Sequence, residues 1–528
     1  MTSDPTGALI MGSRTVPVVV IGAGPTGLAA ATLLAQYGVE SLVLERWDGV
    51  YPLPRAVHLD DEIYRILARL GVGDEFAAIS RPLCGLRLIE PGPRVLAEFP
   101  RQACGRHGFP EGNMFDQPEL ETLLRANLAR HPQSAIRPHT EVTRLVQTGT
   151  GVRVDYTDRV TGQAGVVVTQ YVLGCDGANS HTRTAIGPLG TTMEDLGFEQ
   201  RWLVVDVTTD ADLGQWEGVH QMCDPHRAAT YMQVSATHHR WEFRLLPGET
   251  ADDYRRIEQL LPLLAPWTGT LPADRLELMR LTDYTFHAQV AERWRDRRLF
   301  LLGDAAHLTP PFIGQGMGAG LRDAANLAWK LAGVLGDDLP DSALDTYEAE
   351  RKPHVTALIK RAKLMGTAMT AGGEAGAVVR RVVAPRVQHL AGSGIPVLDT
   401  ATETPAVGRS DLAPRPPLRR TLAGRLCPNA PVDGSRRLDD VAAGRFAVVT
   451  STEPSAAQRA QVERRGAVVV VARPGSELER WLRRGRSTAA VVRPDGTVLR
   501  AGRDLAALYA ALPEFTPARR AASVPAPV

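Results

Sequence analysis

The sequence predicts an α/β protein with three parts: a βαβ unit that opens the chain, an antiparallel sheet inserted into it, and a small C-terminal α/β domain. Three observations predict this arrangement. A β-branched run, then glycines and an Ala- and Leu-rich segment, occupy 18–36. Strand-like segments separated by turns dominate 187–285. A linker rich in proline and arginine at 405–417 precedes short strands that alternate with helical stretches.

The opening unit carries the pattern G-x-G-x-x-G. Residues 18–27 read Val-Val-Val-Ile-Gly-Ala-Gly-Pro-Thr-Gly, and the β-branched run predicts a buried strand. Gly22 permits a tight turn, Gly24 lets a pyrophosphate approach the backbone, and Gly27 lets the following helix pack on the strand. The helix N-terminus offers free N–H groups to the phosphates. The pattern therefore predicts dinucleotide binding.

A second strand at 41–44 ends in Glu45, close to the spacing of about 20 residues at which this fold places the acid for the ribose hydroxyls. The segment 15–39 carries no charge and is long enough to span a bilayer, which takes about 20 residues. Its central glycines and proline, and the β-branched residues in its first part, favour two soluble elements instead.

Composition bounds the class of protein. The 528 residues suggest two to four domains, and Lys+Arg 60 against Asp+Glu 59 leave no net charge to favour nucleic acid or an anionic membrane. Five cysteines with no C-x-x-C argue against a disulfide framework or a metal site and indicate a reducing cytoplasm. Residues 1–14 lack the features of a signal peptide and are expected to form a loose tail.

The rest of the first unit alternates helices and strands. Asp60 and Asp61 open a helix that Gly71 ends, and a hairpin is expected around 86–99. Asp116 and Gln117 open the next helix. Further strands are expected at 142–146, 152–156 and 166–173. The last strand runs into Cys-Asp-Gly-Ala-Asn-Ser at 175–180, at a sheet edge where ligands lie.

The inserted region is the candidate substrate domain. Its expected strands are 202–207, 229–234 and 240–246, with one helix near 252–264. The first unit then resumes with a strand at 298–302, Gly-Asp-Ala-Ala-His at 303–307, a glycine-rich loop at 314–320 and a helix at 321–335. Strands at 446–450, 467–472 and 489–492 belong to the C-terminal domain.

Three separated blocks, 22–27, 175–180 and 303–307, together resemble the fingerprints of the FAD-dependent aromatic hydroxylases, the class A flavoprotein monooxygenases. The stretches 54–60, 113–118 and 240–243 look most like the 3-(3-hydroxyphenyl)propionate and 3-hydroxycinnamate hydroxylases. The C-terminal domain resembles the thioredoxin-like appendage of that subgroup, but Cys427 stands alone and the redox C-x-x-C is missing. A structural role or a role in assembly is expected for this domain.

The resemblance implies a Rossmann-like FAD-binding domain of the glutathione-reductase type, an inserted antiparallel-sheet substrate domain and a thioredoxin-like C-terminal domain. The expected bounds are 15–186 and 286–400 for the two parts of the FAD-binding domain, the second with long helices, 187–285 for the substrate domain and 418–515 for the C-terminal domain.

The resemblance also implies a reaction. NADH or NADPH reduces FAD, the reduced flavin traps dioxygen, and a flavin C4a-hydroperoxide hydroxylates a phenol ortho to its hydroxyl. The expected substrate is 3-(3-hydroxyphenyl)propionate or 3-hydroxycinnamate. The partners are a small aromatic substrate and dioxygen, with no nucleic acid or membrane, and a homodimer is left open. A cytoplasmic location is expected.

Roles for individual residues follow from the resemblance. Glu45 would bind the adenosine ribose and Asp304 the ribityl chain, while Asp176 and Gly177 would seat the pyrophosphate and affect nicotinamide access. Pro311, which has no N–H, suits a wall beside the reacting ring. The catalytic candidates are Pro311, His307 and Arg55. The candidate cofactor contacts are Gly22, Gly24, Pro25, Thr26, Gly27, Glu45, Arg46, Arg55, Gln117, Asp176, Gly177, Asp304, Gly314, Gly316 and Met317.

Several residues have a plainer interpretation beside the functional one. His307 is either a proton relay or a side chain packed under the loop, and packing is the favoured interpretation. His238 and His239 lack metal-ligand spacing and are expected at the surface. Trp241 and Phe243 are expected in the core. A further set either pairs with a substrate carboxylate or faces solvent: Arg201, Arg227 and Arg244.

Three alternatives to the phenol hydroxylase remain. The first is another flavoenzyme on the same fold, a reductase or a halogenase, although the W-x-W-x-I-P signature of halogenases is missing. The second is a non-catalytic FAD carrier, which the complete loop from Asp304 to Gly320 disfavours. The third is a hydroxylase for a larger polycyclic aromatic or an antibiotic.

Overall fold

The computed structural model describes residues 15–53, 55–92, 94–187, 189–370, 373–388, 404–414 and 421–517. The expected tail at 1–14 lies outside the described residues, as do Pro54 and the last part of the linker expected at 405–417.

The first sheet has the strand order β17-β18-β11-β1-β2-β8 and carries the opening unit. Its central strand β1 (Thr15–Ile21) is parallel to β2 (Ser41–Leu44) and to β11 (Ala164–Gly174). Helix α1 (Pro25–Gln36) connects β1 to β2. The uncharged segment 15–39 is therefore a strand and a helix, as expected. Among the described residues, no helix is long and apolar enough to cross a membrane.

The other elements around this sheet confirm most of the expected pattern. Asp60 Oδ1 accepts a hydrogen bond of 2.8 Å from the Ile63 N–H at the start of α2, and Gly71 ends that helix with a φ of 90°. The helices on this part of the chain are α2 (Asp61–Leu70), α3 (Gly73–Ala78), α4 (Gln117–Leu128) and α5 (His181–Thr184). The strands are β8 (Ser134–Arg137), β9 (Thr140–Gln147), β10 (Val152–Asp158), β17 (Arg295–Asp296) and β18 (Leu299–Leu301).

The second sheet has the order β19-β16-β12-β15-β14-β13-β5-β6. The hairpin of β5 (Gly85–Ile89) and β6 (Val95–Pro100) joins it because β5 pairs in parallel with β13 (Val219–Met222). This sheet thus draws on more of the chain than the expected substrate unit, 187–285. Its other strands are β12 (Met193–Thr208), β14 (Ala229–Gln233), β15 (His238–Arg244), β16 (Glu277–Ala291) and β19 (His307–Leu308). The remaining short strands β3 (His58–Leu59), β4 (Ser80–Pro82) and β7 (Asn113–Phe115) form a separate small sheet.

Two helices differ from their expected bounds. The helix expected at 252–264 is α6 (Ile257–Thr268), preceded by a separate turn at Ala251–Tyr254 that Thr250 and Asp253 close with a capping box. The helix expected at 321–335 is α7 (Gly316–Leu335) and takes in the glycine-rich loop. Glycines suit this start because α1 passes close by: a Cβ on Gly320 would lie 2.2 Å from Thr26 Oγ1.

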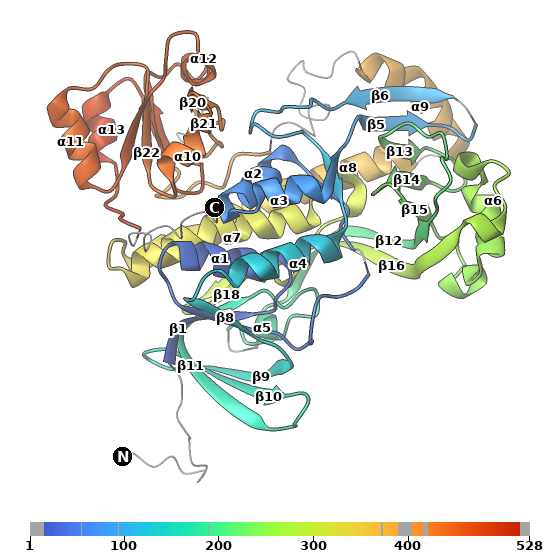
Figure 1. The fold of residues 1–528 in the computed structure, drawn as a ribbon, viewed down its shortest axis with the longest axis horizontal. Coiled ribbons are helices and arrows are strands. Elements are labelled where there is room, and N and C mark those ends of the chain that lie inside the picture. The colour runs from blue at the N-terminus through green and yellow to red at the C-terminus, as the bar shows by residue number, and fades with distance from the viewer. Residues whose placement is uncertain are drawn as a thin grey trace, which may run out of the picture.

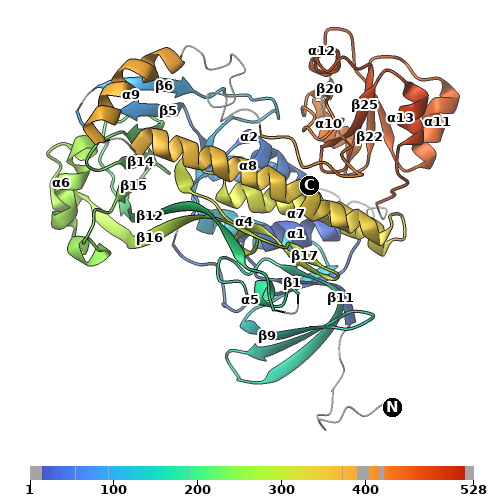
Figure 2. The same ribbon diagram turned by 180° about the vertical axis from the view of Figure 1, so that it is seen from behind.

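Helix α8 (Asp345–Thr370) runs beside α7 through the middle of the molecule, and α9 (Gly373–Gln388) continues to the hairpin β5–β6 (Figure 1, Figure 2). The C-terminal domain lies at one end of α7 (Figure 1). Four of its strands have the order β23-β22-β24-β25, a parallel pair followed by antiparallel neighbours, and this confirms the expected thioredoxin-like topology. Cys427 is buried and free.

The elements of this domain follow the chain as strands and helices in alternation. The strands are β20 (Pro431–Asp433), β21 (Arg436–Arg437), β22 (Ala447–Thr450), β23 (Val468–Val471), β24 (Ala489–Val492) and β25 (Val498–Gly502). The helices are α10 (Leu438–Ala442), α11 (Ala456–Arg464), α12 (Glu477–Arg484) and α13 (Leu505–Ala510).

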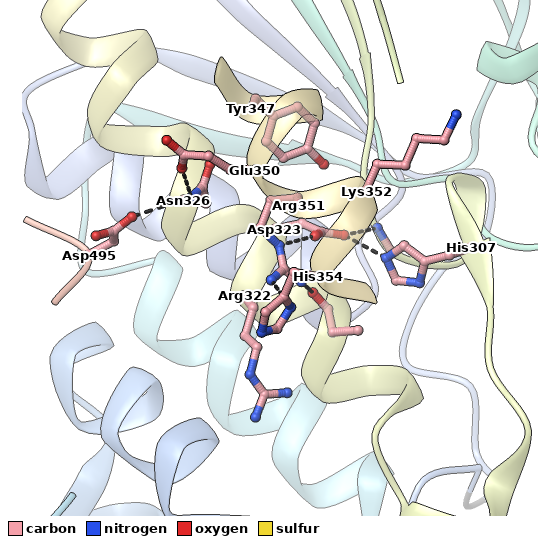
Figure 3. Close-up of polar contacts among 12 residues, drawn as sticks. His307, Arg322, Asp323, Asn326, Tyr347, Glu350, Arg351, Lys352, His354 and Asp495 are labelled. Carbon is pink, nitrogen blue, oxygen red and sulfur yellow. Dashed lines mark hydrogen bonds and ion pairs between the residues drawn. The ribbon is translucent and has the colours of Figure 1, made fainter. Parts of the chain in front are cut away.

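Buried ion pairs join the C-terminal domain to the rest of the chain. Arg493 Nη1 lies 2.8 Å from Glu350 Oε1 on α8, and Lys330 Nζ on α7 lies 2.9 Å from Glu350 Oε2. Asn326 links Glu350 to Asp495 in the same cluster (Figure 3). Because removing one partner of a buried pair costs about 3–5 kcal/mol, these contacts fix the domain on α7 and α8.

Candidate functional site

A cavity of about 440 Å³ is lined by strands of the second sheet, by the loops that follow β11 and β18 of the first sheet, and by the N-termini of α1 and α7. It collects residues that are far apart in the sequence, from Gly24 to Met317. The predicted site residues that line it are Gly24, Pro25, Thr26, Arg55, Gln117, Gly177, Asp304, Pro311, Gly314, Gly316 and Met317.

The three glycines of the opening loop have different surroundings. A Cβ on Gly22 would lie 2.4 Å from the Cys175 carbonyl oxygen, and a Cβ on Gly27 would lie 2.0 Å from the Gly22 oxygen. Gly22 and Gly27 are therefore required by packing. Gly24, in contrast, has no atom within 4 Å of a would-be Cβ and lines the cavity. The space beside Gly24 is where a pyrophosphate can approach the backbone.

The N-termini of α1 and α7 both border this cavity without a side-chain cap. Their N-caps are Gly24 and Gln315, and neither first turn contains an acidic residue. Their N–H groups and the positive ends of both helix dipoles are thus available to a bound anion.

The start of α7 is held in place by an ion-pair network with α2. Asp60 Oδ2 accepts hydrogen bonds of 2.8 Å from both Gln315 Nε2 and Arg322 Nη2, and Arg322 Nε lies 2.8 Å from Glu62 Oε1. Burial alone would raise the pKa of Asp60, but the charge of Arg322 and the hydrogen bond from Ile63 lower it. The network therefore remains ionised at neutral pH and fixes the loop 314–317.

Besides Gly22 and Gly27, three predicted cofactor contacts lie outside the cavity lining. Glu45 stands at the carboxyl end of β2, where Oε2 accepts a hydrogen bond of 2.7 Å from the Ala23 N–H. Arg46 is exposed and lies over the Trp47 ring. Asp176 accepts hydrogen bonds from Ser180 Oγ at 2.5 Å and from the Thr182 N–H at 2.8 Å. Its carboxylate thus shapes the loop that brings Gly177 to the cavity.

Asp304 lies at the cavity wall just after β18. Its carboxylate makes no hydrogen bond within the described part of the chain, and Leu302, not Asp304, is the N-cap of the turn it belongs to. Although the side chain is exposed to the cavity, surrounding protein atoms desolvate it and raise its pKa, against the opposing charges of His307 and Arg55. A hydrogen-bond donor from a ligand would relieve this cost.

The structure places the catalytic candidate His307 outside the cavity lining. His307 is buried under the loop, does not line the cavity, and its Nε2 lies 2.7 Å from Asp323 Oδ2 (Figure 3). The same carboxylate accepts a hydrogen bond of 3.0 Å from the Gly303 N–H. The favoured packing interpretation therefore describes His307, because its ring joins the loop to α7.

The other walls of the cavity are apolar and aromatic with a cationic excess. Gln117 Oε1 accepts a hydrogen bond of 2.6 Å from the Ala56 N–H and holds one wall. The aromatic lining is Trp202, Tyr284, Phe286 and Phe312, and the apolar lining includes Leu83, Leu86, Val219 and Met232. The charged lining is Arg55, Arg101, Arg240, Arg280, Glu242 and Asp304. Four guanidinium groups against two carboxylates favour an anionic ligand.

The arginines for which pairing with a substrate carboxylate and exposure to solvent were both left open do not line the cavity. Arg201 Nη2 pairs with Asp283 Oδ2 at 2.7 Å, and because Trp202 lines the cavity, strand alternation turns Arg201 to the opposite face. Arg227 pairs with Glu249 at 2.5 Å. Arg244 donates to a backbone carbonyl at an exposed position. These residues belong to the solvent-facing alternative, and three of the four cavity arginines were missed: Arg101, Arg240 and Arg280.

His238 and His239 are buried, with 3% and 2% exposure, which corrects their expected surface position. His238 Nδ1 lies 2.9 Å from Asp116 Oδ1, and Nε2 lies 2.8 Å from Asp206 Oδ1. Burial alone would lower the pKa of His238, but these two carboxylates outweigh it and raise the pKa. Asp206 also holds Arg240 through Nε at 2.7 Å.

The aromatic side chains of β15, Trp241 and Phe243, lie in the core, as expected. Trp241 and Phe243 are buried on the face of the strand opposite Arg240, in the core of the second sheet. Alternation along the strand therefore separates this core from the cavity wall.

Residues 15–362 match the family model described as FAD binding domain. The chain belongs to this family. A relative named probable NADH-specific resorcinol 4-hydroxylase, from Rhodococcus jostii (strain RHA1), is 38% identical over 369 residues, covering 70% of this chain and 68% of the relative. A 3-(3-hydroxy-phenyl)propionate/3-hydroxycinnamic acid hydroxylase from Burkholderia cenocepacia (strain HI2424) is 37% identical over 349 residues, covering 66% of this chain and 63% of the relative.

Solved structures share the fold. The flavin-dependent monooxygenase PieE, solved with FAD and substrate, has a TM-score of 0.79 at 23% identity and covers 95% of this chain and 99% of its own. Aklavinone-11 hydroxylase, solved with FAD and aklavinone, has a TM-score of 0.77 at 25% identity and covers 95% of this chain and 99% of its own. The expected fold class and the expected membership in the FAD-dependent aromatic hydroxylases are thereby confirmed.

The site residues fit FAD, the cofactor of this family. The open space at Gly24 and the uncapped end of α1 suit a pyrophosphate, and the uncapped end of α7 suits the pyrimidine edge of a flavin, which gains negative charge on reduction. Glu45 lies next to the glycine loop, where an adenosine ribose would be bound.

Proposed function

We propose that this enzyme is an FAD-dependent monooxygenase that uses NADH or NADPH and dioxygen to hydroxylate a phenolic acid ortho to its hydroxyl. The substrate class is that of 3-(3-hydroxyphenyl)propionate and 3-hydroxycinnamate, which the name of the Burkholderia relative carries. The observation that carries the proposal is the cavity itself, since it combines the elements that fit FAD with an aromatic, cationic pocket.

Different residues would bind the different parts of FAD. Gly24, Thr26 and the N-terminus of α1 bind the pyrophosphate, and Asp304 binds the ribityl hydroxyls. When bound, FAD supplies the redox chemistry, which is to accept a hydride from NAD(P)H and to activate dioxygen. The segment 314–317, which includes the start of α7, would stabilise the negative charge of the reduced cofactor through its N–H groups.

Substrate positioning falls to the apolar walls. Pro311 presents a rigid face without an N–H group, and Trp202 and Phe286 offer flat surfaces for a phenol ring. A phenol is electron-rich at the ortho carbon and therefore suits an electrophilic oxygen donor. Apolar side chains also keep water away, which matters because water diverts reducing equivalents to hydrogen peroxide.

A substrate panel tests this proposal. For each phenol, NAD(P)H oxidation, hydroxylated product and peroxide are measured in the same reaction. A true substrate speeds NAD(P)H oxidation and recovers most reducing equivalents in product, as expected for 3-(3-hydroxyphenyl)propionate. If that acid accelerates oxidation but yields nearly all peroxide, it is an effector. A larger polycyclic phenol, of the kind that aklavinone-11 hydroxylase binds, then becomes the better candidate.

A further inference from the structure

Of the four arginines that line the cavity, Arg55 and Arg101 make no side-chain hydrogen bond or ion pair within the described part of the chain, and of these two only Arg101 is half-buried. Arg240 forms a two-point ion pair with Asp206 and donates a hydrogen bond of 2.6 Å to the Arg55 carbonyl. Arg280 lies in the same charged group, beside Asp206 and Arg240. Arg55 is exposed, with its guanidinium 6.0 Å from the Tyr51 ring. Arg101 is half-buried, and its guanidinium has no hydrogen bond or ion pair among the described residues.

The backbone around Arg101 is firmly held. Arg101 directly follows β6, and its N–H donates a hydrogen bond of 2.9 Å to the Cys84 carbonyl. The neighbouring Gly85 allows a close approach of the two strands, since a Cβ there would lie 2.4 Å from the Phe99 oxygen. Because β5 pairs with β13, this end of the hairpin belongs to the sheet that forms the cavity wall. The guanidinium is thus presented from a rigid element.

His58 connects Arg101 to the loop expected at the flavin edge. His58 lines the cavity, and a Cβ on Gly314 would lie 2.7 Å from His58 Nδ1. Burial and the charge of Arg101 both lower the pKa of His58, to about 4, so the ring is neutral at neutral pH and leaves the positive charge to Arg101. The apolar side chains Leu83 and Met232 line the same cavity. This part of the cavity therefore presents apolar surface with a charged guanidinium.

We propose that Arg101 binds the carboxylate of the phenolic acid and makes the enzyme select acids over neutral phenols. This inference rests on the proposed function, because it takes an aromatic acid as the substrate. A guanidinium can hold a carboxylate with two parallel hydrogen bonds, and a partly desolvated guanidinium gains more from this pairing than one in water. An acid ligand also supplies the hydrogen-bond partner that the Arg101 guanidinium lacks among the described residues.

The test compares an acid with its neutral isostere in the FAD-loaded enzyme. Arg101→Met and Arg101→Lys are each assayed with 3-(3-hydroxyphenyl)propionate and with 3-(3-hydroxyphenyl)propanamide. Arg201→Met, which removes an exposed arginine outside the cavity, is the matched control. KM and kcat are measured in turnover, and Kd is measured without NAD(P)H from the change in the flavin absorbance spectrum.

Arg101→Met is expected to raise KM and Kd for the acid by about 10- to 100-fold, the loss that corresponds to one charged hydrogen-bonded contact. Both constants for the amide stay unchanged, as does the FAD content. Arg101→Lys recovers part of the affinity for the acid, since it restores the charge without the planar fork. Arg201→Met behaves as the unaltered enzyme with both ligands.

Two results would overturn the role of Arg101: equal losses for acid and amide, which indicate a structural effect, or unchanged constants for the acid. In both cases continued hydroxylation of the acid leaves the proposed function intact. The opposite case, in which the carboxylate site is correct and the proposed reaction is wrong, can also be recognised. If the unaltered enzyme binds the acid without hydroxylating it, and Arg101→Met weakens that binding selectively, the carboxylate site stands and the proposed reaction fails.

Discussion

Asp323 Oδ1 accepts a hydrogen bond of 2.7 Å from Arg351 Nε, which joins α7 to α8 beneath the loop that carries Asp304 (Figure 3). The other carboxylate oxygen accepts hydrogen bonds from the Gly303 N–H and from His307. Burial alone would raise the pKa of Asp323, but the charges of Arg351 and His307 lower it. One buried carboxylate therefore fixes both ends of the loop 303–307.

We expect Asp323→Asn to destabilise the protein by about 3–5 kcal/mol, because it leaves the buried charge of Arg351 without its partner. FAD binding should weaken as well, since the loop of Asp304 loses its support. Thermal unfolding and FAD content measure the two effects. Asp283→Asn, in the exposed pair with Arg201, is the control and should cost about 0–1 kcal/mol. Equal effects of the two substitutions would contradict this account.

Gly24→Val should abolish FAD binding while the protein stays folded. The valine side chain fills open space beside the cavity, where the pyrophosphate has to approach, and meets no protein atom within 4 Å at its Cβ. Gly27→Ala is the contrasting variant, because its Cβ would lie 2.0 Å from the Gly22 oxygen and should disturb folding itself. Flavin absorbance and circular dichroism separate the two cases. If the Gly24→Val protein still binds a full complement of FAD, the pyrophosphate does not lie at this loop.

Asp304→Ala should weaken FAD affinity by about one to two decades, since a charge-assisted hydrogen bond is worth about 1.5–3 kcal/mol. The unfolding temperature of the FAD-free protein should rise or stay level, because the substitution removes a desolvated carboxylate whose pKa is raised in the folded state. Titration of FAD into the stripped protein measures the change. An unchanged dissociation constant would contradict the assignment of Asp304 to the ribityl chain.

The two carboxylates that flank the buried His238 predict a pH dependence of stability. The folded-state pKa of His238 is raised above 6.5, so the stability it contributes is fully present below that pH and is lost as pH rises through the folded pKa. Urea unfolding from pH 6.5 upward should therefore show a decline that His238→Gln reduces. His226→Gln, at an exposed position, should leave the decline in place. Identical pH profiles for the two variants would contradict the imidazolium bridge.

Local patterns predicted the parts of the site that lie on consecutive elements. The loop around Gly24 follows a strand and opens a helix, so its glycine spacing and its chemistry are both visible in the sequence. Asp304 was likewise found from its place after a strand and before a glycine-rich loop. In each case the backbone positions that matter lie within a few residues of one another.

The missed residues depend on contacts between distant segments. Arg101 reaches the cavity because β5 pairs with β13 across more than a hundred residues, and nothing local indicates that register. His238 is buried by Asp116 and Asp206, which come from other elements. Arg201 was a candidate for the substrate site because the direction of its side chain depends on which face of β12 lines the cavity.

The most direct test of the central claim follows the oxygen atoms. The FAD-loaded enzyme, NAD(P)H and 3-(3-hydroxyphenyl)propionate react under heavy-isotope-labelled dioxygen in ordinary water, and the product is analysed by mass spectrometry. The account predicts a catechol that carries one labelled oxygen atom per molecule, in step with the NAD(P)H consumed. A product without label, or NAD(P)H consumed with labelled peroxide and no catechol, would contradict it.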